Sequence, residues 1–115
     1  MRDLLKALKA TADESRLRIL NILRIRPLCV CEIADVLGLA QSTISRHLKI
    51  LEESGLLERT KDGLWVEYRL ASTTNGSVPY MLLELLKNAL HGLDTIRKDE
   101  QKAQQVNRNV LCAKE

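Results

Sequence analysis

The sequence contains very few aromatic residues and no phenylalanine. Aromatic residues make up 3% of the 115 positions, whereas hydrophobic residues as a whole make up 45%. The core must therefore consist mainly of Leu, Ile, Val and Ala, which is typical of a mostly helical protein. The chain has no run of about 18 apolar residues that could span a bilayer and no uninterrupted apolar region of the signal-peptide kind. We therefore expect a cytoplasmic protein without a membrane partner.

Cysteine is scarce, and no catalytic constellation is visible. Two of the three cysteines, Cys29 and Cys31, are one residue apart, so a disulfide between them would be strained. We therefore expect free or metal-bound thiols in a reducing compartment. The sequence has no Ser/His/Asp or Cys/His arrangement and no glycine-rich phosphate loop. It predicts neither an enzyme nor a cofactor that folding requires.

Charge of one sign is not in large excess either. The net charge of +3, from 18 basic and 15 acidic residues, is compatible with a polyanionic partner and equally with ordinary solvation. The length suits one compact core. We predict a single DNA-binding and dimerisation domain over residues 1–96, followed by a polar tail over residues 97–115 that could be a frayed helix extension.

Apolar residues recur at helical spacing in several segments. The first runs from about residue 2 to 10, and the second follows the N-cap candidate Asp13 and stops before the proline at position 27. A short third helix begins shortly after the proline at position 27, has apolar residues at helical spacing from 30 to 37 and ends at Gly38, which can adopt the left-handed conformation of a tight turn. A long last helix opens at Pro79 and carries an apolar stripe as far as Ile96.

The middle of the chain predicts a helix-turn-helix followed by a hairpin. After Gly38, Ile44, Leu48 and Leu51 repeat on one helical face, and two short helices joined by a glycine turn are typical of a helix-turn-helix. From Leu56 the period changes to two, which predicts a β-hairpin with its turn at Asp62-Gly63. The expected fold is mostly α with a β-hairpin wing, a winged helix-turn-helix.

The second helix of such a unit presents its outward face to the major groove of DNA. No acidic residue occurs between positions 38 and 51, which suits phosphate binding. The candidate groove contacts are Gln41, Ser42, Thr43, Ser45, Arg46, His47 and Lys49, and the candidate phosphate contacts on the hairpin are Arg59, Lys61 and Arg69. The alternative is that the hydroxyls only cap the helix and that its cations form a solvated face.

Four segments carry a family resemblance. ADESRLRIL at 12–20, LCVCEIA at 28–34, QSTISRHL at 41–48 and GLWVEYRL at 63–70 together resemble the ArsR/SmtB family of metal-responsive repressors. The resemblance covers roughly residues 3–95. It implies a homodimeric winged helix that represses its own operon by binding double-stranded operator DNA and leaves the operator when an inducer binds.

Cys29 and Cys31 are the candidate inducer ligands. Thiolates are soft ligands that select thiophilic ions, and two of them so close together can chelate one ion. On a regular helix, residues two apart point about 200° apart, so we expect binding to distort the start of the third helix. The alternative is that both are small buried hydrophobic residues.

The family resemblance favours trivalent arsenic or antimony as the inducer. Arsenic sensors of this type carry a third cysteine, which would fall at Ala34 in this chain. Cys112, from the same or the partner chain, or a small thiol could complete the coordination instead. The N-terminal cysteines of the related cadmium and lead sensors are absent, and of the last-helix ligands of the zinc sensors only His91 is present.

The leucine stripes of the first and last helices suggest a dimer interface, although the last helix could instead cover its own chain's core. Two further functions stay open. The same scaffold could be a thiol-redox or persulfide sensor in which Cys31 and another cysteine are oxidised. It could also be a winged-helix module that docks proteins without DNA contact.

Overall fold

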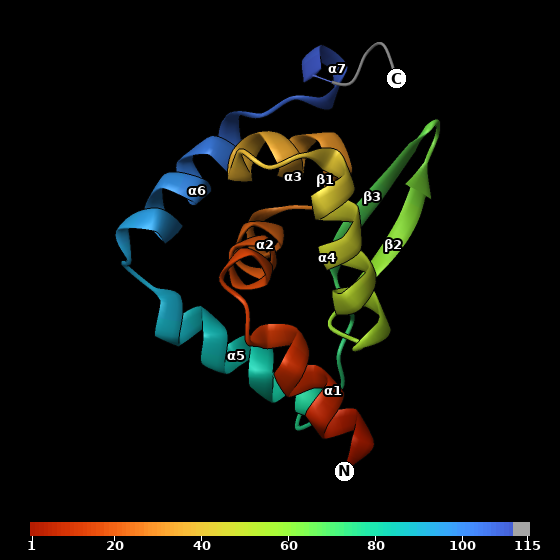
Figure 1. The fold of residues 1–115 in the computed structure, drawn as a ribbon, viewed down its shortest axis with the longest axis vertical. Coiled ribbons are helices and arrows are strands. Elements are labelled where there is room, and N and C mark those ends of the chain that lie inside the picture. Colours follow the sequence, from red (N-terminus) through yellow and green to blue (C-terminus); the bar gives the residue numbers. More distant parts are fainter. Residues whose placement is uncertain (112–115) are drawn as a thin grey trace.

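The computed structural model describes residues 1–111. The elements follow in the order α1 (Arg2–Thr11), α2 (Glu14–Ile25), β1 (Leu28–Cys29), α3 (Val30–Leu37), α4 (Gln41–Glu53), β2 (Leu57–Asp62), β3 (Trp65–Leu70), α5 (Val78–Leu90), α6 (Asp94–Gln105) and α7 (Arg108–Leu111). Helix α2 lies near the centre and contacts α1, α3, α4, α5 and α6, while the β2–β3 hairpin projects at one edge (Figure 1). The mostly helical winged helix-turn-helix is confirmed.

The junction between α1 and α2 is held by side chains that satisfy both helix ends. Asp13 is the N-cap of α2, and its carboxylate accepts a hydrogen bond from the Arg16 amide at 3.0 Å. The Arg16 guanidinium donates at 2.7 Å to the carbonyl of Ala10 in the last turn of α1. The break that the sequence predicts at Asp13 is therefore confirmed, and it fixes the angle at which α1 leaves the core.

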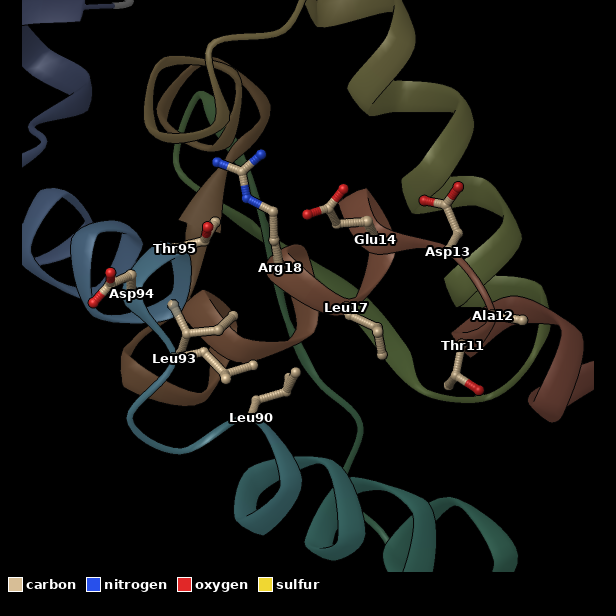
Figure 2. Close-up of a pocket in the computed structure, with 11 residues that line it drawn as sticks. Thr11, Ala12, Asp13, Glu14, Leu17, Arg18, Leu90, Leu93, Asp94 and Thr95 are labelled. Atoms are coloured by element: carbon tan, nitrogen blue, oxygen red, sulfur yellow. The ribbon is translucent and has the colours of Figure 1, made fainter.

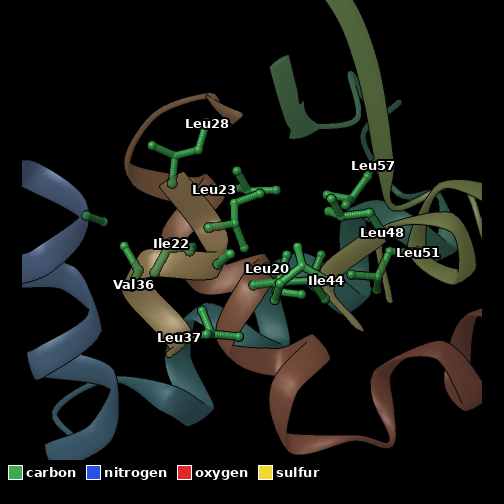
Figure 3. Close-up of a cluster of buried hydrophobic side chains, with 14 of the residues drawn as sticks. Leu20, Ile22, Leu23, Leu28, Val36, Leu37, Ile44, Leu48, Leu51 and Leu57 are labelled. Atoms are coloured by element: carbon green, nitrogen blue, oxygen red, sulfur yellow. The ribbon is translucent and has the colours of Figure 1, made fainter. Parts of the chain in front are cut away.

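The core fixes the position of α4, the second helix of the helix-turn-helix. Ile44, Leu48 and Leu51 repeat at helical spacing and are fully buried. They belong to one apolar cluster with Leu20 of α2 and Leu57 of β2 (Figure 3). Full burial of each such side chain contributes about 1.5–3 kcal/mol, so α4 is anchored by its inner face and leaves its outer face exposed.

The turn between α3 and α4 is the glycine turn that the sequence predicts. Gly38 lies in the left-handed region with φ 71° and ψ 32°. The amides of Gly38 and Leu39 both donate to the carbonyl of Ala34, at 2.8 and 3.2 Å. A side chain at position 38 would strain this conformation, so the residue is suited to a helix-turn-helix.

The sheet differs from the expected hairpin in two ways. Asp62 pairs with Trp65, so the turn residues are Gly63 and Leu64 rather than Asp62-Gly63. Gly63 has a φ of 62° at the first central position, as primed hairpin turns require. In addition, β1 joins the sheet, whose strand order is β1-β3-β2, and β1 was not predicted because two residues give no period.

The single long helix predicted from Pro79 to Ile96 is wrong. Helix α5 ends at Leu90, and the chain turns at Gly92, where φ is 82°, before α6 begins. The apolar stripe continues across the break because Ile96 is buried on α6. Periodicity alone therefore joined two helices that a glycine turn separates.

Helix α6 does not fray, although residues 97–105 had the composition of a polar tail. The Asp99 carboxylate is 2% exposed and accepts two hydrogen bonds from Arg18 of α2, at 2.8 and 3.0 Å. Glu100 accepts from Arg24 at 2.7 Å. Arg26 donates at 2.6 Å to the carbonyl of Val106, just beyond the end of the helix. Ion pairs with α2 thus hold a helix whose sequence is mostly polar.

We predict that Arg18→Ala lowers the free energy of unfolding by about 3 kcal/mol, because it leaves the Asp99 carboxylate buried without its charge partner. Urea unfolding at a fixed protein concentration measures this change. The matched control is Arg97→Ala, which removes an exposed ion pair between Arg97 and Asp94, both on α6. This variant should lower the free energy of unfolding by less than about 0.5 kcal/mol. Equal losses in the two variants would contradict the structural role of the α2–α6 ion pair.

Candidate DNA-binding and sensor sites

The outer face of α4 carries most of the predicted groove contacts. Thr43 is half-buried, and its hydroxyl accepts from the Arg46 guanidinium at 3.5 Å. The exposed members of the predicted set are Gln41, Ser42, Ser45, Arg46 and Lys49. These side chains can donate to phosphates and base edges, and the first turn of α4 contains no carboxylate that would repel a phosphate.

His47 lies on a different face of α4. Its side chain is 18% exposed, and its Nδ1 lies 3.3 Å from a guanidinium nitrogen of Arg16 and 3.9 Å from the Asp13 carboxylate. These contacts join α4 to the α1–α2 junction. The placement therefore favours a role in orienting α4 over the direct DNA contact that the sequence predicts.

The three predicted phosphate contacts on the hairpin do not share one face. Strand register and the period of two place Arg59 and Lys61 on one face of the sheet and Arg69 on the other. Arg59 forms an ion pair with Glu52 of α4 at 3.3 Å, and Arg69 forms one with Glu58 at 3.4 Å. The Arg59 and Lys61 face is the one that adjoins α4.

The two cysteines lie where α3 meets the sheet. Cys29 ends β1, opposite Glu67 of β3, and is also the N-cap of α3 with φ −83° and ψ 162°. Cys31 follows in the first turn of α3, and the two side chains are 4% and 7% exposed. Because Cys29 is extended, the premise that both cysteines lie on one regular helix is wrong, so the geometric argument for a distortion of that helix loses its basis.

The cysteines differ in chemical state. Cys29 carries a free thiol, whereas Cys31 is disulfide-bonded. Of the two cysteines in residues 1–111, Cys29 alone has the expected free thiol, and thiolate ligation by both sulfurs requires reduction at Cys31. Burial raises the pKa of the Cys29 thiol, and a hydrogen bond from Arg108 opposes that rise.

Several neighbours of Cys29 were not singled out in the sequence as members of this site. Glu32 is buried, accepts from the Cys29 amide at 2.9 Å and lies 3.6 Å from the Arg26 guanidinium. Trp65 packs against the cluster that the two cysteines form. Arg108 of α7 reaches the Cys29 sulfur at 3.7 Å. A glutamate three residues after an N-cap was a signal for Glu32, but nothing local signals Arg108.

The ligand set around the cysteines is limited. Ala34 is buried on α3 and offers no donor atom, and Cys112 lies outside the described residues. Within residues 1–111, no group of three or more His, Cys, Asp or Glu side chains could hold a metal ion together. Over the same residues, no helix is both long and apolar enough to cross a membrane.

A separate cavity of about 600 Å³ lies between the α1–α2 junction and the α5–α6 turn. Figure 2 shows its apolar side chains, Leu17, Leu90 and Leu93, together with Arg18 and Asp94. The cavity is lined neither by a cysteine nor by a residue of α4. It therefore belongs to neither of the two candidate sites.

Comparison with known proteins gives a consistent set of relatives. Residues 13–59 match the model of the bacterial regulatory protein, arsR family. The chain is 38% identical over 103 residues to the arsenical resistance operon repressor of Escherichia coli K12, covering 89% of this chain and 80% of that protein.

Three solved structures have a similar fold. That of HlyU from Vibrio cholerae is 38% identical with a TM-score of 0.65, covering 80% of this chain and 95% of that one, and a second structure is described as reduced HlyU. A homodimeric winged helix-turn-helix DNA-binding domain from Mycobacterium bovis is 29% identical with a TM-score of 0.66, covering 80% of this chain and 83% of that one.

We predict that at pH 7.5 iodoacetamide alkylates the Cys29 thiol more slowly than it alkylates the thiol of free glutathione. Burial raises the pKa of the Cys29 thiol and restricts access to it. Mass spectrometry that resolves each cysteine measures the alkylation rate of Cys29. This rate should still rise with pH in the range where the alkylation rate of glutathione has become constant. Trp65→Ala, which removes the aromatic cover, should accelerate the reaction. Alkylation of wild-type Cys29 as fast as glutathione would contradict this description of the site.

Proposed function

This chain belongs to the arsR family of bacterial regulatory proteins, and we propose that it is a repressor that leaves its operator when trivalent arsenic or antimony binds Cys29 and Cys31. The family consists of helix-turn-helix regulators rather than enzymes, and we expect this one to act in the cytoplasm, on double-stranded operator DNA. The observation that carries the proposal is the burial of both sulfurs against Trp65, where α3 of the helix-turn-helix meets the wing.

The donor set suits a thiophilic metalloid. Once Cys31 is reduced, two soft sulfurs lie at one apolar site. Arsenous acid can react with the two thiols, whose protons leave with two of its hydroxyl groups as two waters, so that two As–S bonds form and the third hydroxyl is retained. Cys112 or a small thiol could replace that last hydroxyl. The similarity to an arsenical resistance operon repressor supports arsenic over other thiophilic ions.

The DNA contacts in this proposal divide between groove and backbone. Helix α4 enters the major groove, where Gln41 can pair with adenine and Arg46 with guanine or a phosphate. Phosphates are contacted by hydroxyls and cations, namely Ser42, Thr43, Ser45 and Lys49 on α4 and Arg59, Lys61 and Arg69 on the wing. The ion pairs of Arg59 and Arg69 with glutamates are exposed, so phosphates can compete for these cations.

Inducer binding at the two cysteines can change the positions of both proposed DNA-contacting elements, α4 and the wing. Cys31 lies on α3, which packs against α4 through the core, and Cys29 is paired with Glu67 in the wing strand β3. A change in the positions of the two sulfurs therefore shifts the start of α3 and the base of the wing together. Release from DNA follows when α4 and the wing no longer match the groove and its flanking phosphates.

We further propose that the working form is a homodimer. Exposed leucines lie on α1, including Leu5 and Leu8, and on α5, including Leu85, and the two helices contact each other. A contiguous apolar surface of this kind suits a two-fold interface with a second copy. The Mycobacterium bovis domain with the same fold is described as homodimeric, which supports this assignment.

A second candidate function is a thiol-redox switch. In this alternative, Cys31 and a second cysteine lose two electrons and two protons to an oxidant such as hydrogen peroxide as a disulfide forms, and the protein leaves DNA. The disulfide at Cys31 favours it, as does the similarity to HlyU, for which a reduced form is described.

We predict that arsenite or antimonite weakens binding of the reduced protein to an operator duplex at least about tenfold, whereas zinc does not. The duplex is one selected by the wild-type protein from a random pool, and fluorescence anisotropy reports affinity. Cys29→Ser and Cys31→Ser should each bind the duplex normally but lose most of the response, because one sulfur cannot chelate. Cys112→Ser tests the third ligand.

The same titration separates the two candidates. Release by hydrogen peroxide without release by arsenite would contradict the metalloid proposal and favour the redox switch. A full arsenite response in both Cys29→Ser and Cys31→Ser would contradict the assignment of these ligands. Steep weakening of binding with salt is expected of a protein that contacts phosphates, and its absence would contradict DNA binding itself.

We predict that Leu85→Glu converts the protein to a monomer and weakens operator binding at least about tenfold. A monomer contacts one half-site and loses the affinity gained when two linked units bind two half-sites together. Leu85 is 59% exposed on α5. Sedimentation velocity measures the oligomeric state. The matched control is Leu64→Glu at the hairpin turn, where the side chain is 97% exposed, and it should leave the dimer intact. A wild-type protein that sediments as a monomer at the concentration of operator binding would contradict the dimer.

A further inference from the structure

Arg108, near the C-terminal end of the described chain, contacts Cys29 and three residues of the hairpin. It lies on α7 and donates to the Cys29 sulfur at 3.7 Å, to the Glu67 carboxylate at 3.0 Å and to the Asp62 carboxylate at 2.8 Å. Its guanidinium carbon also lies 5.2 Å from the centre of the Trp65 ring. One cation thus connects the sensor cysteine to both strands of the hairpin.

The alternation of the strands explains why these groups meet. Asp62 is opposite Trp65, and Glu67 is opposite Cys29 and separated from Trp65 by two positions. Because side chains two apart lie on one face, all four groups project from the same face of the sheet. Arg108 covers this face, which lies opposite the one that carries Arg59 and Lys61.

The charges give this contact a consequence for DNA binding. Asp62 and Glu67 are two carboxylates on the hairpin that is proposed to lie against phosphates. Arg108 forms ion pairs with both. If the guanidinium leaves, the hairpin retains two uncompensated negative charges beside a polyanion, which lowers affinity for DNA.

We propose that Arg108 is a positioning residue that couples the state of Cys29 to the wing, and this inference rests on the proposed function. While the Cys29 sulfur is unliganded, Arg108 bridges Cys29, Asp62 and Glu67, fixes the hairpin and neutralises its carboxylates. When a thiophilic ion bonds to Cys29, Arg108 is displaced, and the hairpin becomes more acidic and less restrained.

Displacement follows from the crowding at the sulfur. The Arg108 guanidinium donates to the Cys29 sulfur and so occupies space beside the atom to which arsenic would bond. Trp65 and the neighbouring cysteine pack against the same buried thiol. An arsenic atom that keeps one hydroxyl group therefore needs space that the guanidinium, 3.7 Å from the sulfur, occupies. The ion and Arg108 compete for one side of Cys29.

The test measures operator affinity and arsenite binding separately, on the reduced protein. Without arsenite, Arg108→Ala should bind the selected duplex about fivefold or more weakly than wild type. Asp62→Asn with Glu67→Gln, added to Arg108→Ala, should restore most of that affinity because the exposed carboxylates are gone. Arg97→Ala, which removes a solvent-exposed cation on α6, is the control and should bind like wild type apart from weak nonspecific loss.

Arsenite binding without DNA is followed by the near-ultraviolet absorbance of the arsenic–thiolate bond. Arg108→Ala should still bind arsenite, yet arsenite should release it from DNA by a smaller factor than it releases wild type. Arg108→Lys, which keeps the charge but loses the forked contact, should lie between them and guards against misfolding of the alanine variant.

Wild-type affinity and a full arsenite release factor in Arg108→Ala would overturn the role of Arg108. If the wild type binds no arsenite at all, the proposed inducer fails. The affinities measured without arsenite, together with the rescue by the carboxylate substitutions, then still decide whether Arg108 controls the charge of the wing.

Discussion

The pairing of β1 with the wing strand β3 is the constraint on which the two sites depend. Two residues are enough to form it, Leu28 opposite Tyr68 and Cys29 opposite Glu67. Leu28 faces the core and is fully buried, so Cys29 must face the other side of the sheet, with Trp65 and Arg108. The candidate ligand Cys29 is thereby paired with the hairpin strand β3 and is also the cap of the first helix of the helix-turn-helix.

The C-terminal segment acts on the same sheet from outside. Helix α6 is held against α2 by Arg18 with Asp99 and by Arg24 with Glu100, and Arg26 binds the carbonyls at its end. These contacts determine where α7 begins and so deliver Arg108 to the face of the sheet on which Cys29 lies. A segment with the composition of a solvated tail comes to lie against Cys29 because ion pairs place it there.

Local patterns in the sequence predict most of the fold. The caps at Asp13 and Gly38, the buried face of α4 and the hairpin all follow from spacing and turn chemistry. The division of the last helix at Gly92 was missed because the leucine stripe continues across it. The strand β1, the buried pair of Arg18 with Asp99 and the reach of Arg108 depend on contacts between residues far apart in the sequence, for which a single sequence has no periodic signal.

Local patterns in the sequence also predict part of the candidate site. Two cysteines one residue apart indicate a thiolate site, and the polar outer face of α4 indicates a groove contact. The register of the strands was needed to assign the side chains of the wing to its two faces. The packing of α1 against α4 was needed to find that His47 points inward. Sequence spacing thus suggests the chemistry of the candidate site, whereas the three-dimensional structure adds the contacts that join Cys29 to the hairpin and to α3.

The central claim is that the state of Cys29 is transmitted to the wing through β1 and β3. Amide hydrogen exchange of the reduced protein, with and without arsenite, measures it directly. Arsenite should lower the protection of the β3 amides from Glu67 to Leu70 in the wild type and leave it unchanged in Cys29→Ser. Release from the operator with no change of exchange in β3 would contradict the account.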